Sequence, residues 1–195
     1  MIKALQLVFA PGTTWQKIVE TRRGIAFISM VFLLPLMILS CAVEGYSLWR
    51  WGKAEVTFGH RMGFATNAVI TFEAAQLIAG MLVVVIGARV VLWLGTSFQF
   101  RPRFSQCFTV AAYGLSPIFL ARFLNAVPAM NPWVSWAIGI TGCIYVLYQG
   151  VGLVLQPEST QGMGLYMLSG LVFFMLSGLA QLIALTILHQ GGLKF

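Results

Sequence analysis

The chain has 195 residues, of which 59% are hydrophobic and 9% are charged, and its net charge of +7 includes no aspartate. Soluble domains carry about 25% charged residues, so this composition excludes a water-soluble fold of this size. Long continuous apolar runs, rather than the short alternating segments of a membrane β-barrel, predict helices that span a bilayer. An excess of Lys and Arg is typical of residues that orient a membrane protein and contact anionic lipid. The sequence shows no basic soluble face that could bind nucleic acid.

Residues 1–23 are mixed in polarity and predict a short amphipathic segment at the membrane interface. Thr13 followed by Gln16 is typical of a capping box at a helix start. Apolar residues share two successive helical faces, separated by Pro11 and Gly12: Ile2, Leu5, Val8 and Phe9, then Trp15, Ile18 and Val19. This pattern favours two short helices lying in the interface.

Five later runs are long and apolar enough to cross a membrane, which takes about 20 residues. They cover about residues 25–43, 66–95, 104–125, 132–155 and 164–189. Proline and polar residues separate the last three runs. The sequence therefore predicts an all-α membrane domain over residues 1–195, a polytopic helix bundle of five transmembrane helices with a short amphipathic N-terminal segment.

The distribution of Lys and Arg predicts the orientation. One side of the membrane receives Lys3, Lys17, Arg22, Arg23, Arg101 and Arg103, and the other receives Arg50, Lys53, Arg61 and Lys194. Because cytoplasmic loops carry an excess of Lys and Arg, we expect the N-terminus in the cytoplasm and the C-terminus outside.

Ionisable residues within spans are costly and are therefore functional candidates. Glu73 in the second span and Arg122 in the third lie at adjacent outer ends, so a pair between them is geometrically possible. Such a pair either docks the helices or forms a gate or ligand site. Pro117 should kink the third span, with Ser116 bonding a freed carbonyl. Together with Tyr113, these residues define a candidate intramembrane polar site.

Arginines near the predicted cytoplasmic side are candidate contacts for lipid headgroups. Arg89 lies near the inner end of the second span, where its side chain either extends to the lipid phosphates or binds a specific headgroup. The other candidates are Arg22, Arg23, Arg101 and Arg103.

An outer-side group of Cys41, Glu44, His60 and His189 is the one arrangement that could suggest a metal or catalytic cluster. The chain contains no HExxH, GxSxG or glycine-rich phosphate loop, and its cysteines lack metal-binding spacing. We therefore expect no catalytic residue, cofactor or metal, and a protein that is not an enzyme.

Three stretches resemble the Yip1 domain family: Phe9 to Ile18 with its Pro11 and Trp15, Ala112 to Pro117, and Tyr145-x-x-Tyr148-x-Gly150 followed by a polar turn. Their order and the five-span plan extend the resemblance over nearly the whole chain. Eukaryotic members of this family bind Rab-type GTPases and carry a long N-terminal region with an Asp-Leu-Tyr-Gly-Pro motif. This chain has no aspartate and a short N-terminal segment, so the GTPase-binding role is not carried over.

The resemblance to the short bacterial form implies a protein of the bacterial inner membrane. We expect a non-enzymatic protein that organises membrane through lipids, a membrane-protein partner or a homo-oligomer, without nucleic acid. The alternative is a small transporter or lipid-handling protein with a polar site around Glu73, Arg122 and Tyr113. A polar cavity containing Glu73 at mid-membrane depth would favour the alternative.

Overall fold

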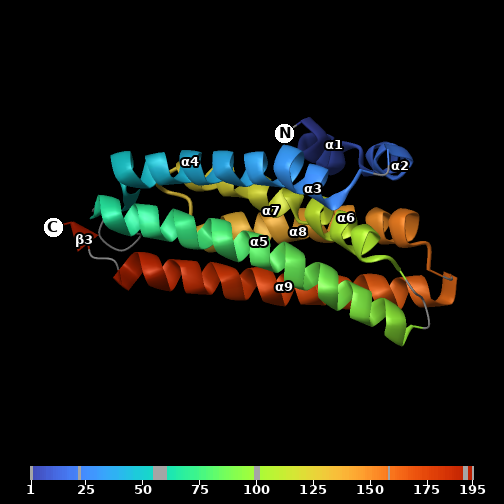
Figure 1. Cartoon of the computed structure of the whole chain (residues 1–195). Coiled ribbons are helices and arrows are strands. Elements are labelled where there is room, and N and C mark those ends of the chain that lie inside the picture. Colours follow the sequence, from blue (N-terminus) through green and yellow to red (C-terminus); the bar gives the residue numbers. More distant parts are fainter. Residues whose placement is uncertain are drawn as a thin grey trace.

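The computed structural model describes residues 2–21, 23–54, 61–98, 102–157, 159–190 and 193–194. Five helical segments are long and apolar enough to cross a membrane: Ile25–Trp51, Thr66–Ser97, Phe104–Ala126, Pro132–Leu155 and Gln161–Leu188. They pack side by side as one bundle (Figure 1). The predicted all-α, five-span architecture is confirmed.

Two short helices precede the spans, which are themselves divided into regular and irregular segments. The helices are α1 (Ile2–Phe9), α2 (Pro11–Thr21), α3 (Ile25–Phe27), η1 (Ile28–Leu33), α4 (Leu34–Trp51), α5 (Thr66–Ser97), α6 (Phe104–Gly114), α7 (Ser116–Ala121), η2 (Arg122–Ala126), α8 (Pro132–Gly150), η3 (Val151–Leu155) and α9 (Ser159–Gln190). The N-terminal end of the bundle is where α2 lies and where α5 passes to α6 (Figure 1). The C-terminal end is the opposite one, where α4 passes to α5.

Three two- to four-residue strands lie at the C-terminal end. They are β1 (Lys53–Ala54), β2 (Arg61–Phe64) and β3 (Leu193–Lys194). Strand β2 pairs antiparallel with both others, with Lys53 opposite Met62 and Gly63 opposite Lys194. Residues 193–194 are thereby paired with the segment that connects the first two spans.

The first span is eight residues longer than the apolar run predicted, because the helix continues past Glu44 to Trp51. Glu44 is almost completely buried. A buried carboxylate is tolerated in a membrane only when it is paired, and its partner lies on the third span. Counting apolar residues alone therefore ended this helix too early.

The third span is broken at its centre, as Pro117 predicted. Helix α6 ends at Gly114 and α7 starts at Ser116. Proline has no N–H, so the carbonyl of Tyr113 four residues earlier loses its helical donor. The Ser116 hydroxyl donates a hydrogen bond of 2.7 Å to that carbonyl. Ser116 and Pro117 thus serve the backbone of this span.

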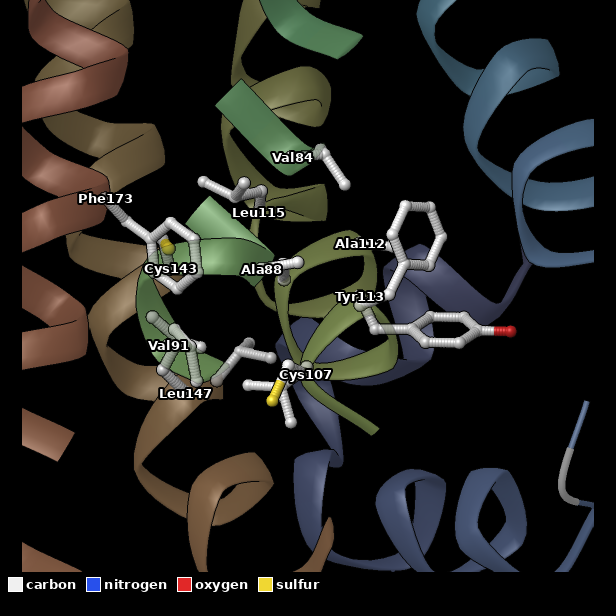
Figure 2. Close-up of a cluster of buried hydrophobic side chains, with 14 of the residues drawn as sticks. Val84, Ala88, Val91, Cys107, Ala112, Tyr113, Leu115, Cys143, Leu147 and Phe173 are labelled. Atoms are coloured by element: carbon white, nitrogen blue, oxygen red, sulfur yellow. The ribbon is translucent and has the colours of Figure 1, made fainter. Parts of the chain in front are cut away.

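A continuous apolar core joins α5, α6, α8 and α9. Val84 and Val91 of α5, Leu147 of α8 and Phe173 of α9 all belong to this core and are buried (Figure 2). Helix α7 packs directly on α8, since a Cβ atom placed on Gly139 would lie only 2.8 Å from the Cα atom of Ile118. This backbone contact fixes α7, and η2 with Arg122 follows it directly.

The N-terminal helices are docked on the bundle as well as amphipathic. Trp15 is fully buried, and its indole N–H donates a 3.0 Å hydrogen bond to the Val146 carbonyl. Gly150 provides the space, because a Cβ there would lie 2.5 Å from the indole ring. In α1 the side chains of Ala4 and Leu7 face the bundle and are fully buried, whereas Leu5 and Phe9 are exposed. The face predicted from spacing is therefore the one turned away from the core.

Candidate functional site

A buried cluster of charged side chains joins the first three spans near the C-terminal end. The Arg122 guanidinium donates to Glu44 through Nε (3.0 Å) and Nη2 (2.8 Å). Nη2 also donates to Glu73 Oε2 at 3.0 Å, and Nη1 lies 3.4 Å from the Cys41 sulfur. The Glu73–Arg122 pair considered from the sequence is present, with Glu44 as the closer partner.

The two carboxylates of this cluster differ in how fully they are bonded. Both oxygens of Glu44 accept hydrogen bonds, since Asn125 Nδ2 donates to Oε1 at 2.9 Å. Glu73 accepts through Oε2 alone, and its Oε1 has no hydrogen-bond partner among the described residues. Their side chains are 1% and 14% exposed. Both carboxylate oxygens of Glu44 are thus hydrogen-bonded within the fold, whereas only one oxygen of Glu73 is hydrogen-bonded to a described residue.

Glu44 and Cys41 were placed outside the membrane by sequence analysis, in a group with two histidines. They instead lie inside the bundle. His60 and the side chain of His189 fall outside the described residues, and within those residues no group of His, Cys, Asp or Glu is arranged to hold a metal. Helical spacing in the sequence could have indicated this position. Glu44 and Cys41 lie on one face of the first span with six other residues, and all of them are buried: Leu33, Leu36, Met37, Ser40, Ser47 and Leu48.

A polar cavity of about 580 Å³ opens at the N-terminal end, between α2, η1, α6 and η3. Arginine, amide and hydroxyl side chains dominate its polar lining: Thr21, Arg23, Arg103, Ser105, Gln106, Thr109, Tyr113 and Gln156. Its apolar wall comes from α2, η1 and η3. We refer to it as the basic cavity.

Tyr113 belongs to this cavity, away from the charged cluster. Its ring packs against Phe32 and Trp15 with centroid distances of 4.3 and 6.1 Å. Its hydroxyl points away from the other labelled side chains of the core (Figure 2). Arg122 lies nine residues further along the span, or about 13 Å at 1.5 Å per residue. The structure therefore divides the candidate intramembrane site between two locations.

Gln106 lines the basic cavity and forms hydrogen bonds to two of the elements around it. Its Oε1 accepts a 2.8 Å hydrogen bond from the backbone N–H of Arg103 at the start of α6. Its Nε2 donates to the Val154 carbonyl at 3.3 Å. The segment η3 is a π-helix followed by Gln156 in the left-handed region (φ 50°), and Gln106 bonds one of its carbonyls. Gln106 thus links α6 to η3 in the lining of the basic cavity.

The basic cavity has positive charge that the described residues leave unbalanced. Arg23 and Arg103 form no ion pair with a described carboxylate, and the Arg23 guanidinium stacks on Phe27 at 4.3 Å. Partial burial, together with the positive charge of Arg23, lowers the pKa of Lys3. Among the described residues, Arg23 and Arg103 therefore give this end of the bundle an excess of positive charge.

The structure describes only some of the other arginines that were predicted to contact lipid headgroups. Arg89 is exposed at the same end of the bundle, with its guanidinium 4.8 Å from the centre of the Phe104 ring. It does not line the basic cavity. Arg22 and Arg101 lie outside the described residues. Of the five predicted arginines, Arg23 and Arg103 are therefore the two that the structure brings to one cavity.

A smaller cavity of about 40 Å³ lies between α5, α7, α8 and α9. Its lining includes Arg122, Gln76 and Gln181, and the Nε2 atom of Gln76 has no partner among the described residues. Since one water occupies about 10–15 Å³ by this measure, the space holds a few waters. Glu73 does not line it.

The comparisons with known proteins agree with the resemblance found in the sequence. The model of the Yip1 domain matches residues 5–184, nearly the whole chain. No curated protein and no solved structure matches the chain.

Proposed function

We propose that this chain, which belongs to the Yip1 domain family, is a non-enzymatic membrane protein that organises the bilayer by binding anionic phospholipids. The basic cavity at the N-terminal end carries this proposal. Arg23 and Arg103 line the same space of about 580 Å³, which is within the range of about 300–1,000 Å³ for small-molecule sites. A phosphodiester headgroup supplies the negative charge that the cavity lacks.

The chemistry of the lining fits a phosphate and its substituents. Guanidinium groups form paired hydrogen bonds to phosphate oxygens. The hydroxyl of Tyr113 and the amide of Gln156 supply further donors for a glycerol or sugar substituent, and the Thr109 hydroxyl, which donates to the Ser105 carbonyl, can accept from it. Neither a carboxylate nor an imidazole is among the described lining residues, so the cavity offers binding groups without a general base. This supports binding rather than catalysis.

The position of the cavity fits a headgroup of the inner leaflet. The N-terminal end carries the larger share of Lys and Arg in the sequence, which favours a cytoplasmic location. Anionic lipid gives that leaflet a negative surface potential, and each basic residue near it gains about 1 kcal/mol. These points support a proposed location in a bacterial inner membrane, with the basic cavity facing the cytoplasm.

A transporter with one polar site around Glu73, Arg122 and Tyr113 is the less favoured alternative. Tyr113 lines a different cavity from Arg122, and Glu73 borders neither. The space beside Arg122 holds only a few waters, so no solute path passes through it in this conformation. The geometry favours a lipid-binding protein with a closed interior.

Lipid binding is tested by native mass spectrometry of the full-length protein released from non-ionic detergent. Phosphatidylglycerol is titrated against phosphatidylcholine, and glycerol 3-phosphate serves as the headgroup without its chains. We expect saturable retention of phosphatidylglycerol, and a loss of about tenfold in affinity in the double variant Arg23→Gln/Arg103→Gln. Retention of glycerol 3-phosphate alone would reassign the cavity to a soluble phosphate compound.

Arg89→Gln is the matched control, because it removes one exposed arginine from the same end without touching the cavity. It should bind phosphatidylglycerol as the unmodified protein does. Equal losses in both variants would mean that general charge, rather than the cavity, attracts the lipid. Unchanged binding in the double variant would overturn the proposal.

The orientation has its own test. A reporter that is active only outside the cytoplasm is fused after Phe195, and in a second fusion the same reporter precedes Met1. Activity of the first fusion and silence of the second are expected. The reverse result would put the basic cavity on the outer side and remove the argument from the inner leaflet.

A further inference from the structure

A groove of about 400 Å³ runs between α4 and α5 at the C-terminal end. Its lining from α4 is Cys41, Ala42, Gly45, Tyr46 and Trp49, and from α5 it is Thr66, Val69, Ile70 and Glu73. Because Tyr46, Trp49 and Ile70 are highly exposed on membrane-spanning helices, the groove faces lipid. From Cys41 to Trp49 it extends about 12 Å along the helix axis.

Glu73 lies at the deep end of this groove. The Cys41 thiol is 3.8 Å from the Glu73 carbonyl, which places the two residues at the same level. The Glu73 carboxylate crosses over Gly45, where a Cβ atom would lie 3.4 Å from Oε1. Gly45 and Glu73 both line the groove, so the Glu73 carboxylate lies next to it, although its Oε1 atom is itself buried in this conformation.

The charges of the cluster indicate what the groove can accept. Glu44 and Glu73 share the single guanidinium of Arg122, so with all three groups ionised the cluster has one negative charge in excess. Glu44 has both oxygens bonded, and Glu73 has one free. The excess charge and the free acceptor therefore coincide on the residue that borders the groove.

The remaining chemistry narrows the occupant to one class. A metal ion such as calcium needs six to eight oxygen ligands, and within the described residues no suitable group exists. An anionic headgroup would meet repulsion from Glu73, and a neutral acyl chain would leave the excess negative charge uncompensated. An ammonium group on an apolar body is attracted by the charge of the Glu73 carboxylate and packs its body against Tyr46 and Trp49, whose rings also attract cations.

We infer that the groove between α4 and α5 is a binding site for a lipophilic amine in its ammonium form, with Glu73 as its counter-ion. The site is reached from the lipid phase, between the exposed faces of the two helices. It is independent of the basic cavity, which lies at the other end of the bundle and takes the opposite charge.

The probe for this site is decylammonium, and decanol is the neutral compound of equal chain length. Both are titrated against the full-length protein in non-ionic detergent, and bound probe is counted by native mass spectrometry. We expect one decylammonium per protein with saturable binding, and no retained decanol. Equal retention of decanol would show partition into an apolar surface and would overturn the inference.

Two variants separate the counter-ion from the shape of the groove. Glu73→Gln keeps the side-chain shape and should weaken decylammonium binding by about tenfold. Ala42→Leu fills the exposed wall while leaving every charged residue in place, and it should weaken binding to a similar extent. If Glu73→Gln fails to fold, Ala42→Leu still tests the site. Unchanged binding in a folded variant of either kind would overturn the inference.

Glu20→Gln is the matched control, because it removes an exposed carboxylate from α2 at the opposite end. Its decylammonium binding should equal that of the unmodified protein. Dimerisation that depends on Glu73, in the absence of any probe binding, would assign the groove to a cationic side chain of a second copy and would also overturn the inference. Loss of phosphatidylglycerol binding bears only on the basic cavity.

Discussion

Arginines occupy two polar regions at opposite ends of the same bundle, and their surroundings give them different roles. At the C-terminal end, Arg122 is 8% exposed and bonds two carboxylates of its own chain. At the N-terminal end, Arg23 and Arg103 are exposed and line a cavity with no described carboxylate. The charge of Arg122 is compensated within the fold, whereas no described carboxylate compensates Arg23 and Arg103.

The difference shows that pairing and burial, more than residue type, separate a structural charge from a binding charge. Removing one member of a buried ion pair leaves the other charge without compensation, at a cost of about 3–5 kcal/mol. Removing an exposed charge changes stability by about 0.5 kcal/mol or less. Stability and lipid binding should therefore respond to different arginines.

The largest expected effect comes from Arg122→Met, which leaves Glu44 and Glu73 buried without a positive partner. Its free energy of unfolding, measured by SDS titration of the detergent-solubilised protein, should fall by about 3–5 kcal/mol. Arg89→Met is the control and should change it by about 0.5 kcal/mol or less. A small effect of Arg122→Met would mean that the cluster does not hold the first three spans together.

The next effect compares the two carboxylates. Glu44→Gln should cost about 3 kcal/mol, because Arg122 and Asn125 both bond it, whereas Glu73→Gln loses one bond and should cost about 1 kcal/mol. The double variant Glu73→Gln/Arg122→Gln should lose less stability than the sum of its single changes. Strictly additive losses would show that Glu73 and Arg122 are not coupled.

Ser116→Ala tests the junction between the two regions, since it removes the hydroxyl bonded to the Tyr113 carbonyl. A buried carbonyl left without its donor costs about 1–2 kcal/mol. Thermal melting should show this loss, and Ser105→Ala, an exposed change on α6, should not. An additional loss of phosphatidylglycerol binding would show that the break at Pro117 also positions the basic cavity.

The smallest expected effect on stability is that of Arg103→Gln. Because this side chain is exposed and unpaired among the described residues, unfolding should change by about 0.5 kcal/mol or less. Binding of phosphatidylglycerol should nevertheless weaken several-fold and become less sensitive to salt. A stability loss as large as that of Arg122→Met would remove the contrast between the two regions.

Sequence analysis predicted most of the fold because the bilayer imposes a simple rule on long apolar runs. The runs at about 66–95, 104–125 and 132–155 match the observed spans closely, and Pro117 marked the break in the third. The first run was cut short at Glu44. That run was ended at the first charge after its apolar residues, and the sequence alone cannot show that the partner of Glu44 lies 78 positions away.

The candidate site was predicted in part for the same reason. Glu73 and Arg122 stood out because charges within spans are rare. Tyr113 was grouped with them by its place in the third span, although its ring faces Trp15 and Phe32 at the other end. Arg23 and Arg103 were recognised as basic residues of one side, but only the docking of α2 against α8 encloses a cavity between them.

By itself the sequence determined that this protein resides in a lipid bilayer, that it is helical, how many spans it has and to which family it belongs. These follow from composition, run length and local motifs, which need no knowledge of neighbouring helices. Only the tertiary structure decided which charges neutralise one another, which glycine admits Trp15, and which arginines and carboxylate remain available to a ligand. Pairing between distant spans depends on packing distances of a few ångströms, and the order of residues along the chain does not specify them.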